Sequence, residues 1–320
     1  MHNKDELYSL YSRKLLQATE GAALACQEWV GRGKEKDADK AAVEAMRAAF
    51  NSVDMEGRII IGEGERDKAP MLYVGEKVGL GGVALDIAVD PLEGTTICAT
   101  GGMNSVSVLA AGPKDSMLCA PDVYMEKLAV QSELSPGVIN LDFSVKQNMD
   151  NICAEVGCAL QDVVVTILNR PRHEKMIGEC RRLGLRVNLI SDGDIFATID
   201  PYLKNDGFFH VYMGIGGAPE GVLAAAALKT LGGSMLGRLI LDDDVKRKSA
   251  LKCGIEPRDN KQYGINDMVG NDVIFIATGV TSGSVLDGVE IYEKWANINS
   301  VILSSCSKRI EYVNAAVPLL

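Results

Sequence analysis

Two carboxylates stand three residues apart where an apolar run ends, in the segment Asp90-Pro91-Leu92-Glu93-Gly94-Thr95. The run before them, residues 83–89, is β-branched and nearly uninterrupted, which is typical of a strand buried on both faces. Proline and glycine predict a turn here, with the Thr95 hydroxyl capping a following helix. Carboxylates bind divalent cations and free backbone amides bind phosphate. The segment therefore suggests metal-assisted phosphate chemistry, although these residues are also ordinary turn formers.

Further acids stand at the ends of expected strands or in loops. They are Asp39, the group Glu63, Glu65 and Asp67, the turn Asp192-Gly193-Asp194, and Glu220. Each has an ordinary interpretation when taken alone, since glycine turns attract aspartate and the first turn of a helix favours a charge such as that of Glu220. Their shared placement, an acid after a strand with a glycine beside it, is what a carboxylate-lined cleft at strand ends would require.

Cations are few, and the most suggestive pair is Arg170 and Arg172, which flank Pro171 after the strand expected at 163–168. The planar guanidinium group binds phosphate through two parallel hydrogen bonds, so this pair suits an anion. The alternative is that both arginines solvate the start of a helix. Tyr124 and Lys127 suit either substrate contact or an exposed surface.

Alternating strands and helices joined by short loops predict an α/β fold with a largely parallel sheet. The expected helices cover the first thirty residues, 39–51, 173–183 and the apolar stretch after Pro219; the expected strands are 58–61, 83–89, 105–110, 163–168, 186–190, 210–215 and 272–277. A soft boundary near residue 160 divides the chain into an N-terminal metal-binding half, 1–160, and a C-terminal half, 161–320, that completes the substrate site.

The composition excludes several classes of protein. The 320 residues carry a net charge of −10, which disfavours nucleic-acid binding, and no apolar stretch is long enough to span a membrane or act as a signal peptide. The eight cysteines form no C-x-x-C pair, which predicts reduced thiols and a cytoplasmic protein. P-loop, Rossmann and nucleophile-elbow motifs are all missing from the sequence.

Seven ordered blocks resemble the class II fructose-1,6-bisphosphatases, within the lithium-sensitive sugar and inositol phosphatase superfamily. The blocks are A-D-K-A-A-V-E-A-M-R, I-I-G-E-G-E-R-D-K-A-P-M-L-Y-V-G-E-K-V-G, D-I-A-V-D-P-L-E-G-T, A-P-D-V-Y-M-E-K-L, N-R-P-R-H, S-D-G-D and G-I-G-G-A-P-E-G-V. This resemblance implies a layered α-β-α-β-α sandwich. It also implies hydrolysis of the 1-phosphate of fructose 1,6-bisphosphate to fructose 6-phosphate and phosphate, in gluconeogenesis.

The resemblance further implies a set of site residues. The ligands of Mg²⁺ or Mn²⁺ would be Asp39, Glu63, Asp90, Glu93 and Glu220. The substrate-binding residues would be Glu93, Gly94, Thr95, Tyr124, Arg170, Pro171, Arg172, Asp192, Gly193, Asp194 and Gly217, with the reacting phosphate at the Gly94-Thr95 turn. Phosphoryl transfer needs charge neutralisation and an in-line water more than a covalent nucleophile. We expect Thr95, with Asp39 or Glu63, to orient that water.

The chain departs from the family pattern four residues before Asp39, where Glu35 stands in place of the usual lysine, between Lys34 and Lys36. The resemblance is also weak after Gly288. Sedoheptulose 1,7-bisphosphate and, less favoured, an inositol monophosphate are alternative substrates, and a catalytically silent scaffold is an alternative of another class. A second anion site at the arginine pair favours a bisphosphate, and the presence of all five expected metal ligands disfavours a scaffold. We expect a homo-oligomer.

Overall fold

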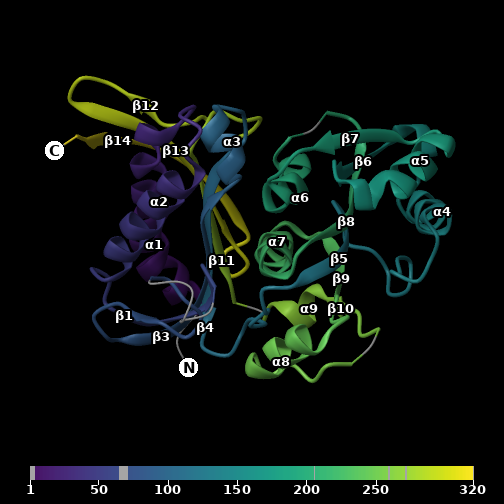
Figure 1. The fold of residues 1–320 in the computed structure, drawn as a ribbon, viewed down its shortest axis with the longest axis horizontal. Coiled ribbons are helices and arrows are strands. Elements are labelled where there is room, and N and C mark those ends of the chain that lie inside the picture. The colour runs from purple at the N-terminus through teal and green to yellow at the C-terminus, as the bar shows by residue number, and fades with distance from the viewer. Residues whose placement is uncertain (1–3, 65–70, 205, 259, 271, 320) are drawn as a thin grey trace. The chain divides into compact units, whose positions relative to one another are not determined.

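The computed structural model describes residues 4–64, 71–204, 206–258, 260–270 and 272–319 (Figure 1). Its contacts divide the chain into two units, Met1–Leu118 with Val269–Leu320, and Cys119–Met268. This division differs from the boundary expected near residue 160, because the last strands of the chain pair with strands of the first unit. The second unit is therefore an insertion between two strands of the first.

The sheet of unit 1 has eight strands among the described residues, in the order β12-β13-β11-β4-β3-β1-β2, with β14 paired to β13. Their bounds are β1 Met55–Ile61, β2 Lys77–Val78, β3 Val83–Glu93, β4 Val106–Pro113, β11 Ile274–Gly279, β12 Glu290–Ile291, β13 Trp295–Ser304 and β14 Arg309–Pro318. Only β1 and β3 are parallel in this described sheet.

Helices α1 (Lys4–Ala25) and α2 (Glu35–Phe50) pack together against this sheet, with the short helix η1 (Gln27–Trp29) between them (Figure 1). Met46 and Phe50 of α2 are fully buried in the core that forms there. The sequence predicted that the second helix begins at Asp39; it begins four residues earlier, at Glu35. Asp39 therefore lies inside a helix and not at its start.

The sheet of unit 2 has six strands among the described residues, in the order β10-β9-β5-β8-β6-β7, and β8, β6 and β7 run parallel. The strands are β5 Tyr124–Val130, β6 Val163–Leu168, β7 Arg186–Ile190, β8 Phe209–Gly217, β9 Ser234–Leu239 and β10 Tyr263–Gly264. The helices are α4 Val145–Val156, α5 Glu174–Arg182, α6 Asp194–Leu203, α7 Ala218–Leu231, α8 Asp244–Lys252 and α9 Ile265–Met268, with η2 Leu160–Asp162 and η3 Pro171–His173.

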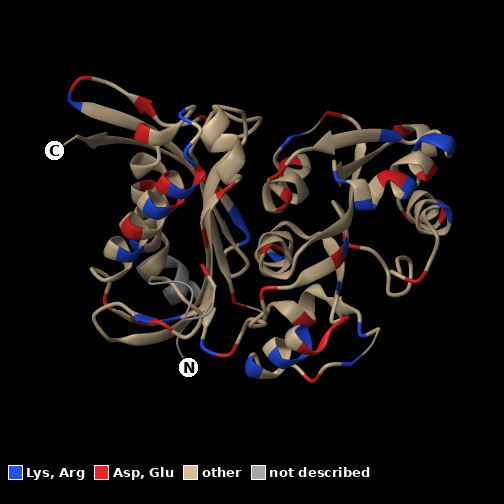
Figure 2. Ribbon diagram, in the orientation of Figure 1, with Lys and Arg blue, Asp and Glu red and all other residues tan. Residues whose placement is uncertain are grey.

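Within unit 2, α6 and α7 cover one face of the sheet, and α4 and α5 cover the other (Figure 1). Unit 2 thus has α-β-α layers and unit 1 has α-β layers, which are the layer types of the expected sandwich. Charged residues lie mostly on helices and loops, and the strands are mostly uncharged (Figure 2). Among the described residues, no helix has the length and apolarity needed to cross a membrane.

The fold is α/β, as predicted, but the prediction of a largely parallel sheet was wrong, because both sheets are mixed and most of their strand pairs are antiparallel. The sequence analysis considered only the side chains of Tyr124 and Lys127 in the segment that forms β5 and predicted no strand there. It did not predict β13 or β14 either. These strands pair antiparallel with their neighbours. An apolar run marks a buried strand without marking its direction, since direction is set by the connections.

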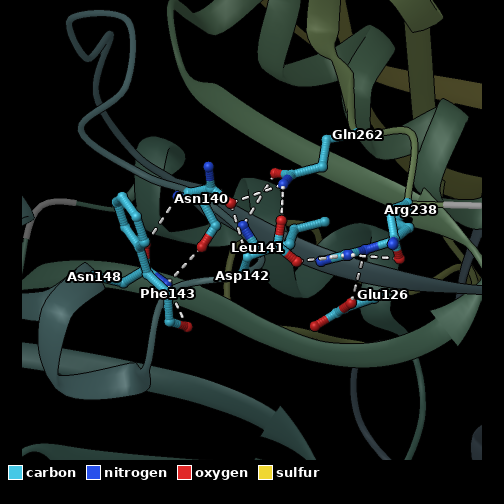
Figure 3. Close-up of polar contacts among 9 residues, drawn as sticks. Glu126, Asn140, Leu141, Asp142, Phe143, Asn148, Arg238 and Gln262 are labelled. Carbon is cyan, nitrogen blue, oxygen red and sulfur yellow. Dashed lines mark hydrogen bonds and ion pairs between the residues drawn. The ribbon is translucent and has the colours of Figure 1, made fainter.

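A polar network fixes the segment 131–144 of unit 2, between β5 and α4 (Figure 3). Arg238 of β9 donates to Asp142 at 2.7 Å and pairs with Glu126 of β5 at 3.2 Å. Gln262 donates to the side chains of Asn140 at 2.7 Å and Asp142 at 3.1 Å. Within this segment, Asn140 and Asp142 are therefore held to β9 and to Gln262 by both neutral and charge-assisted hydrogen bonds.

Candidate active site

In unit 1, the parallel strands β1 and β3 bring two of the predicted acids to one edge of the sheet. Ile61 pairs with Ala88, and each strand reaches an acid two residues later, Glu63 and Asp90. The carboxyl ends of adjacent parallel strands are where open α/β sheets bind ligands. Gly62 is required beside Glu63, because a Cβ there would lie 2.0 Å from the carbonyl oxygen of Leu72. Glu65 and Asp67 lie outside the described residues.

The chain does not turn at Asp90, as the sequence predicted, because β3 continues to Glu93. Against β4, Asp90 pairs with Val108 and Glu93 pairs with Val106, so β3 holds one extra residue in a β-bulge. The N–H of Leu92 donates to Asp90 Oδ1 at 3.1 Å across this bulge. A bulge accommodates proline in a strand and changes the direction of the side chains that follow, here the buried Glu93.

Thr95 is the first residue of the short helix α3 (Thr95–Thr100), and its predicted capping role was wrong. The capping position belongs to Gly94, whose φ of 78° lies in the left-handed region, and no side chain caps the helix there. Asp39 lies in helix α2, and α2 packs on α3. The N–H of Gly31 donates to Cys98 at 2.9 Å, just before α2. Burial raises the pKa of Asp39.

Another acid of the same block, Asp86, has a structural role. It is fully buried in β3 and accepts two hydrogen bonds from Arg58 of β1, at 2.8 and 2.9 Å. The same guanidinium group donates to Asp115 at 2.7 Å. A buried carboxylate needs such a partner. Asp86 is therefore satisfied within the strand pair, whereas Asp90, four residues on, lies at the edge.

In unit 2, the parallel strands β7, β6 and β8 carry the predicted substrate residues at their carboxyl ends. Arg170 and Arg172 follow β6, Asp192 and Asp194 follow β7, Gly217 ends β8 and Glu220 lies in the first turn of α7. Tyr124 begins β5 directly opposite Gly217, at the same edge. One edge of one sheet thus collects the predicted residues of this unit. Pro171 and Gly193 form the turns that present them.

The arginine nearest Tyr124 is held in place by two contacts. Arg172 donates to the carbonyl oxygen of Ile215 from Nε at 3.1 Å and from Nη2 at 2.7 Å. Its guanidinium group lies 4.9 Å from the centroid of the Tyr124 ring, which is a cation–π distance. Both side chains are exposed. Arg172 is therefore preordered at the surface, where a ligand anion can reach it.

His173 is a residue of this site that the sequence analysis did not assign. It is 1% exposed, and its two ring nitrogens bond to the carbonyl oxygen of Leu168 at 2.7 Å and to the N–H of Ile215 at 2.9 Å. The second contact requires an unprotonated Nε2, so the ring is the neutral Nδ1–H tautomer. Burial lowers its pKa accordingly. His173 is the last residue of the block N-R-P-R-H, and its place in that block was the signal in the sequence that could have assigned it to the site.

Buried charges gather around Asp194 at the start of α6. Its Oδ2 accepts a hydrogen bond from Lys127 Nζ at 2.7 Å and another from the Tyr212 hydroxyl at 3.0 Å. Glu220 belongs to the same group, since burial raises its pKa while the charge of Lys127 opposes that rise. A Cβ at Gly217 would lie 1.8 Å from Glu220 Oε2, so only glycine leaves room for this carboxylate.

Among the described residues, no three His, Cys, Asp or Glu side chains converge closely enough to hold a metal ion. One atom nevertheless suits a cation. Glu220 Oε2 is buried and accepts no hydrogen bond from any described residue. A buried carboxylate oxygen without a donor is costly, and a hard cation is the kind of ligand that relieves the cost. The residues present therefore fit a divalent cation in their chemistry.

Comparison with known proteins gives a consistent picture. The family model described as "Bacterial fructose-1,6-bisphosphatase, glpX-encoded" matches residues 10–317, which includes the segment after Gly288. "Fructose-1,6-bisphosphatase 1 class 2" of Escherichia coli K12 is 44% identical over 314 residues, covering 93% of this chain and 92% of that protein. The class 2 enzyme of Haemophilus influenzae is 42% identical over 312 residues, covering 93% of each chain.

Some relatives carry a second activity in their names. A protein of Trichodesmium erythraeum named "D-fructose 1,6-bisphosphatase class 2/sedoheptulose 1,7-bisphosphatase" is 40% identical over 329 residues, covering 94% of each chain. The strand-edge acids, the bulge at Pro91 and the arginine turn after β6 lie within the seven sequence blocks named above. The chain belongs to the class 2, glpX-type fructose-1,6-bisphosphatase family of phosphoric monoester hydrolases.

Proposed function

We propose that this chain hydrolyses the 1-phosphate of fructose 1,6-bisphosphate in gluconeogenesis, using Mg²⁺ or Mn²⁺ held by carboxylates. The observation that carries the proposal is the placement of the candidate residues at the carboxyl ends of parallel strands in each unit. Unit 1 contributes acids there, and unit 2 contributes arginines and acids. Carboxylates suit the cations that a phosphate needs, and arginines suit a phosphate directly.

The carboxylates Asp39, Glu63, Asp90, Glu93 and Glu220 are the proposed cation ligands. A bound divalent cation neutralises the phosphate and lowers the pKa of a water that it binds. The buried Glu220 Oε2 and the glycine beside it support this assignment. All five ligands are oxygen donors, which suits Mg²⁺ and Mn²⁺ better than a soft metal.

The remaining site residues bind and orient the reactants. Gly94 and Thr95 hold the reacting phosphate, and the Thr95 hydroxyl, with the carboxylate of Asp39 or Glu63, orients water in line with the bond to the sugar oxygen. The water oxygen bonds to phosphorus as the bond between phosphorus and the sugar oxygen breaks. The water gives a proton to the carboxylate, the sugar oxygen takes a proton from solvent, and fructose 6-phosphate and phosphate leave.

The distant phosphate binds Arg170 and Arg172, whose guanidinium groups suit a dianion. Asp192 and Asp194 accept hydrogen bonds from sugar hydroxyls. Tyr124, Pro171, Gly193 and Gly217 complete the substrate-binding surface. The contact of Arg172 with both Tyr124 and Ile215 supports this role, because a preordered arginine loses little entropy when it binds an anion.

The first experiment measures phosphate release from fructose 1,6-bisphosphate with Mg²⁺, with Mn²⁺ and with chelator. We expect release that requires the metal. Glu63→Gln is expected to lower kcat by about 10³-fold or more while the protein stays folded, since electrostatic stabilisation of this kind is commonly worth that much. Glu56→Gln is a matched control, because Glu56 is exposed on β1, the strand that precedes Glu63. Full activity of Glu63→Gln would remove Glu63 from the mechanism.

Sedoheptulose 1,7-bisphosphate is the second candidate substrate, because relatives that are about as similar as the Escherichia coli enzyme carry both activities in their names. Both substrates have two phosphates, so Arg170 and Arg172 suit either. The ratio of kcat/KM for the two bisphosphates, with inositol 1-phosphate as a monophosphate control, decides between a single and a double specificity.

The proposed location is the cytoplasm and the proposed assembly is a homo-oligomer. All eight cysteines are unbonded, which suits a reducing compartment. Large apolar side chains such as Trp295 and Ile310 are exposed on β13 and β14 and are candidates for a subunit contact. Light scattering across a dilution series measures the assembly, and a monomer at every concentration would contradict it.

A further inference from the structure

Lys127 lies in the interior of unit 2, although the sequence left it as either a substrate contact or a surface residue. It belongs to β5 and is 2% exposed, and its Nζ donates to Asp194 Oδ2 at 2.7 Å. An ammonium group is expensive to bury without a negative partner, so its position here needs a reason. Among the residues whose burial the structure describes, it is the only buried lysine or arginine.

The geometry around Asp194 shows what the ammonium group does. Both Lys127 Nζ and the Tyr212 hydroxyl donate to the same oxygen, Oδ2, from two neighbouring strands, β5 and β8. Two donors on one carboxylate oxygen fix the plane of the carboxylate. The other oxygen, Oδ1, takes part in neither of these two bonds.

The surrounding backbone is shaped to admit this ion pair. A Cβ at Gly216 would lie 2.1 Å from Asp194 Oδ2 and 3.1 Å from Lys127 Nζ. A Cβ at Gly221 would lie 3.3 Å from Lys127 Cε. Glycines of the segment G-G-A-P-E-G therefore leave the space that the lysine and its partner occupy. The same segment carries Glu220, which the charge of Lys127 also influences.

We propose that Lys127 is a positioning residue: its ammonium group fixes Asp194 for a sugar hydroxyl and balances the negative charge of Asp194 and Glu220. The proposal rests on the proposed function, which assigns Asp194 to the sugar and Glu220 to the cation. In this proposed role, Lys127 contacts Asp194 and contacts neither the substrate nor the cation. Its effect is on substrate affinity through Asp194.

The test compares Lys127→Met, which keeps the length of the side chain without its charge, with Lys127→Arg and with Tyr212→Phe. Lys77→Met is the control, because Lys77 is an exposed lysine on β2. We expect Lys127→Met to raise the KM for fructose 1,6-bisphosphate about tenfold, which equals ~1.4 kcal/mol, with a smaller change in kcat. Lys127→Arg is expected to restore part of the loss, and Tyr212→Phe to raise KM about threefold.

A second readout separates positioning from damage to the fold. Equilibrium titration of Mn²⁺ without substrate is expected to show no weakening in Lys127→Met, because removing one cation does not reduce the attraction for another. An unchanged KM in folded Lys127→Met and in Tyr212→Phe would overturn the proposal, and so would a parallel loss of Mn²⁺ and substrate affinity. Inactivity of the unmodified protein on every bisphosphate would instead contradict the proposed function.

Discussion

His173 Nε2 accepts the backbone N–H of Ile215 at 2.9 Å, and the carbonyl oxygen of the same Ile215 accepts both hydrogen bonds of Arg172. One peptide group of β8 and its neighbour therefore hold the end of the N-R-P-R-H segment from two sides. The buried ring ties the turn after β6 to β8, and the exposed arginine takes its orientation from that turn. The anion site proposed at Arg172 thus depends on a buried histidine.

Replacing His173 with Phe keeps a ring of similar size and removes both hydrogen bonds. It removes the partner of the part-buried N–H of Ile215 and one of the two donors to the carbonyl of Leu168, which keeps the N–H of Arg170. The loss is expected to cost about 1–3 kcal/mol of unfolding free energy. We also expect a higher KM for bisphosphates, because Arg172 loses its fixed position. Denaturant unfolding and steady-state kinetics measure the two effects. His210→Gln is the control, since the His210 ring bonds only to Asp206 among the described residues; equal losses in both variants would argue against the special role of His173.

The stability of the protein is expected to fall in mild acid through the same residue. Burial lowers the pKa of His173 below its ordinary value of about 6.5, so the unfolded chain binds a proton that the folded chain does not. The stabilisation is complete above pH ~6.5 and is lost progressively as pH falls towards the folded pKa. Unfolding measured between pH 8 and pH 5 is expected to show this loss, and His173→Phe is expected to reduce it. Identical pH profiles would contradict the assignment.

Glu20 of α1 is expected to have the opposite pH dependence. Burial raises its pKa to about 7, and its Oε1 accepts no hydrogen bond from any described residue. The folded chain therefore holds a proton that the unfolded chain has lost, and stability falls as pH rises from about 4.3 to about 7. Glu20→Gln is expected to stabilise the protein by about 1 kcal/mol at pH 8 and by less at pH 5. The matched control is Glu28→Gln, at an exposed glutamate, where no pH-dependent gain is expected.

Two glycine substitutions are expected to have different effects, one lowering turnover and the other raising stability. Gly217→Ala places a Cβ 1.8 Å from Glu220 Oε2, so the carboxylate must move, and we expect a loss of metal-activated turnover of about 10²-fold. Gly178→Ala meets no atom within 4 Å in the middle of α5 and is expected to stabilise the fold by about 0.5–1 kcal/mol with unchanged turnover. Phosphate-release assays and thermal unfolding of both variants check the pair. Full activity of Gly217→Ala would show that turnover does not depend on the position of the Glu220 carboxylate.

Much of the site's scaffold was predictable from sequence. Strand 163–168 is a short, mostly apolar run, strand 186–190 alternates polar and apolar residues, and both end in polar turns. Their acids and arginines lie at the expected strand ends. The bulge at Pro91 was not predictable, because a proline and a glycine after a strand are equally compatible with a turn. Lys127 was misjudged and His173 was not assigned for a related reason: whether a polar side chain is buried depends on partners distant in sequence, here Asp194 and Ile215.

The insertion of unit 2 between β4 and β11 has a consequence for synthesis of the chain. Strand β4 ends at Pro113, and its partner β11 begins roughly 160 residues later, at Ile274. A ribosome adding about 5–20 residues per second makes that partner ~10–30 s after β4 has emerged. During this interval the apolar edge of β4 has no strand to pair with, and such edges promote association between chains. Unit 2 is continuous in sequence and can fold meanwhile, so newly made chains depend most on chaperones before the last fifty residues arrive.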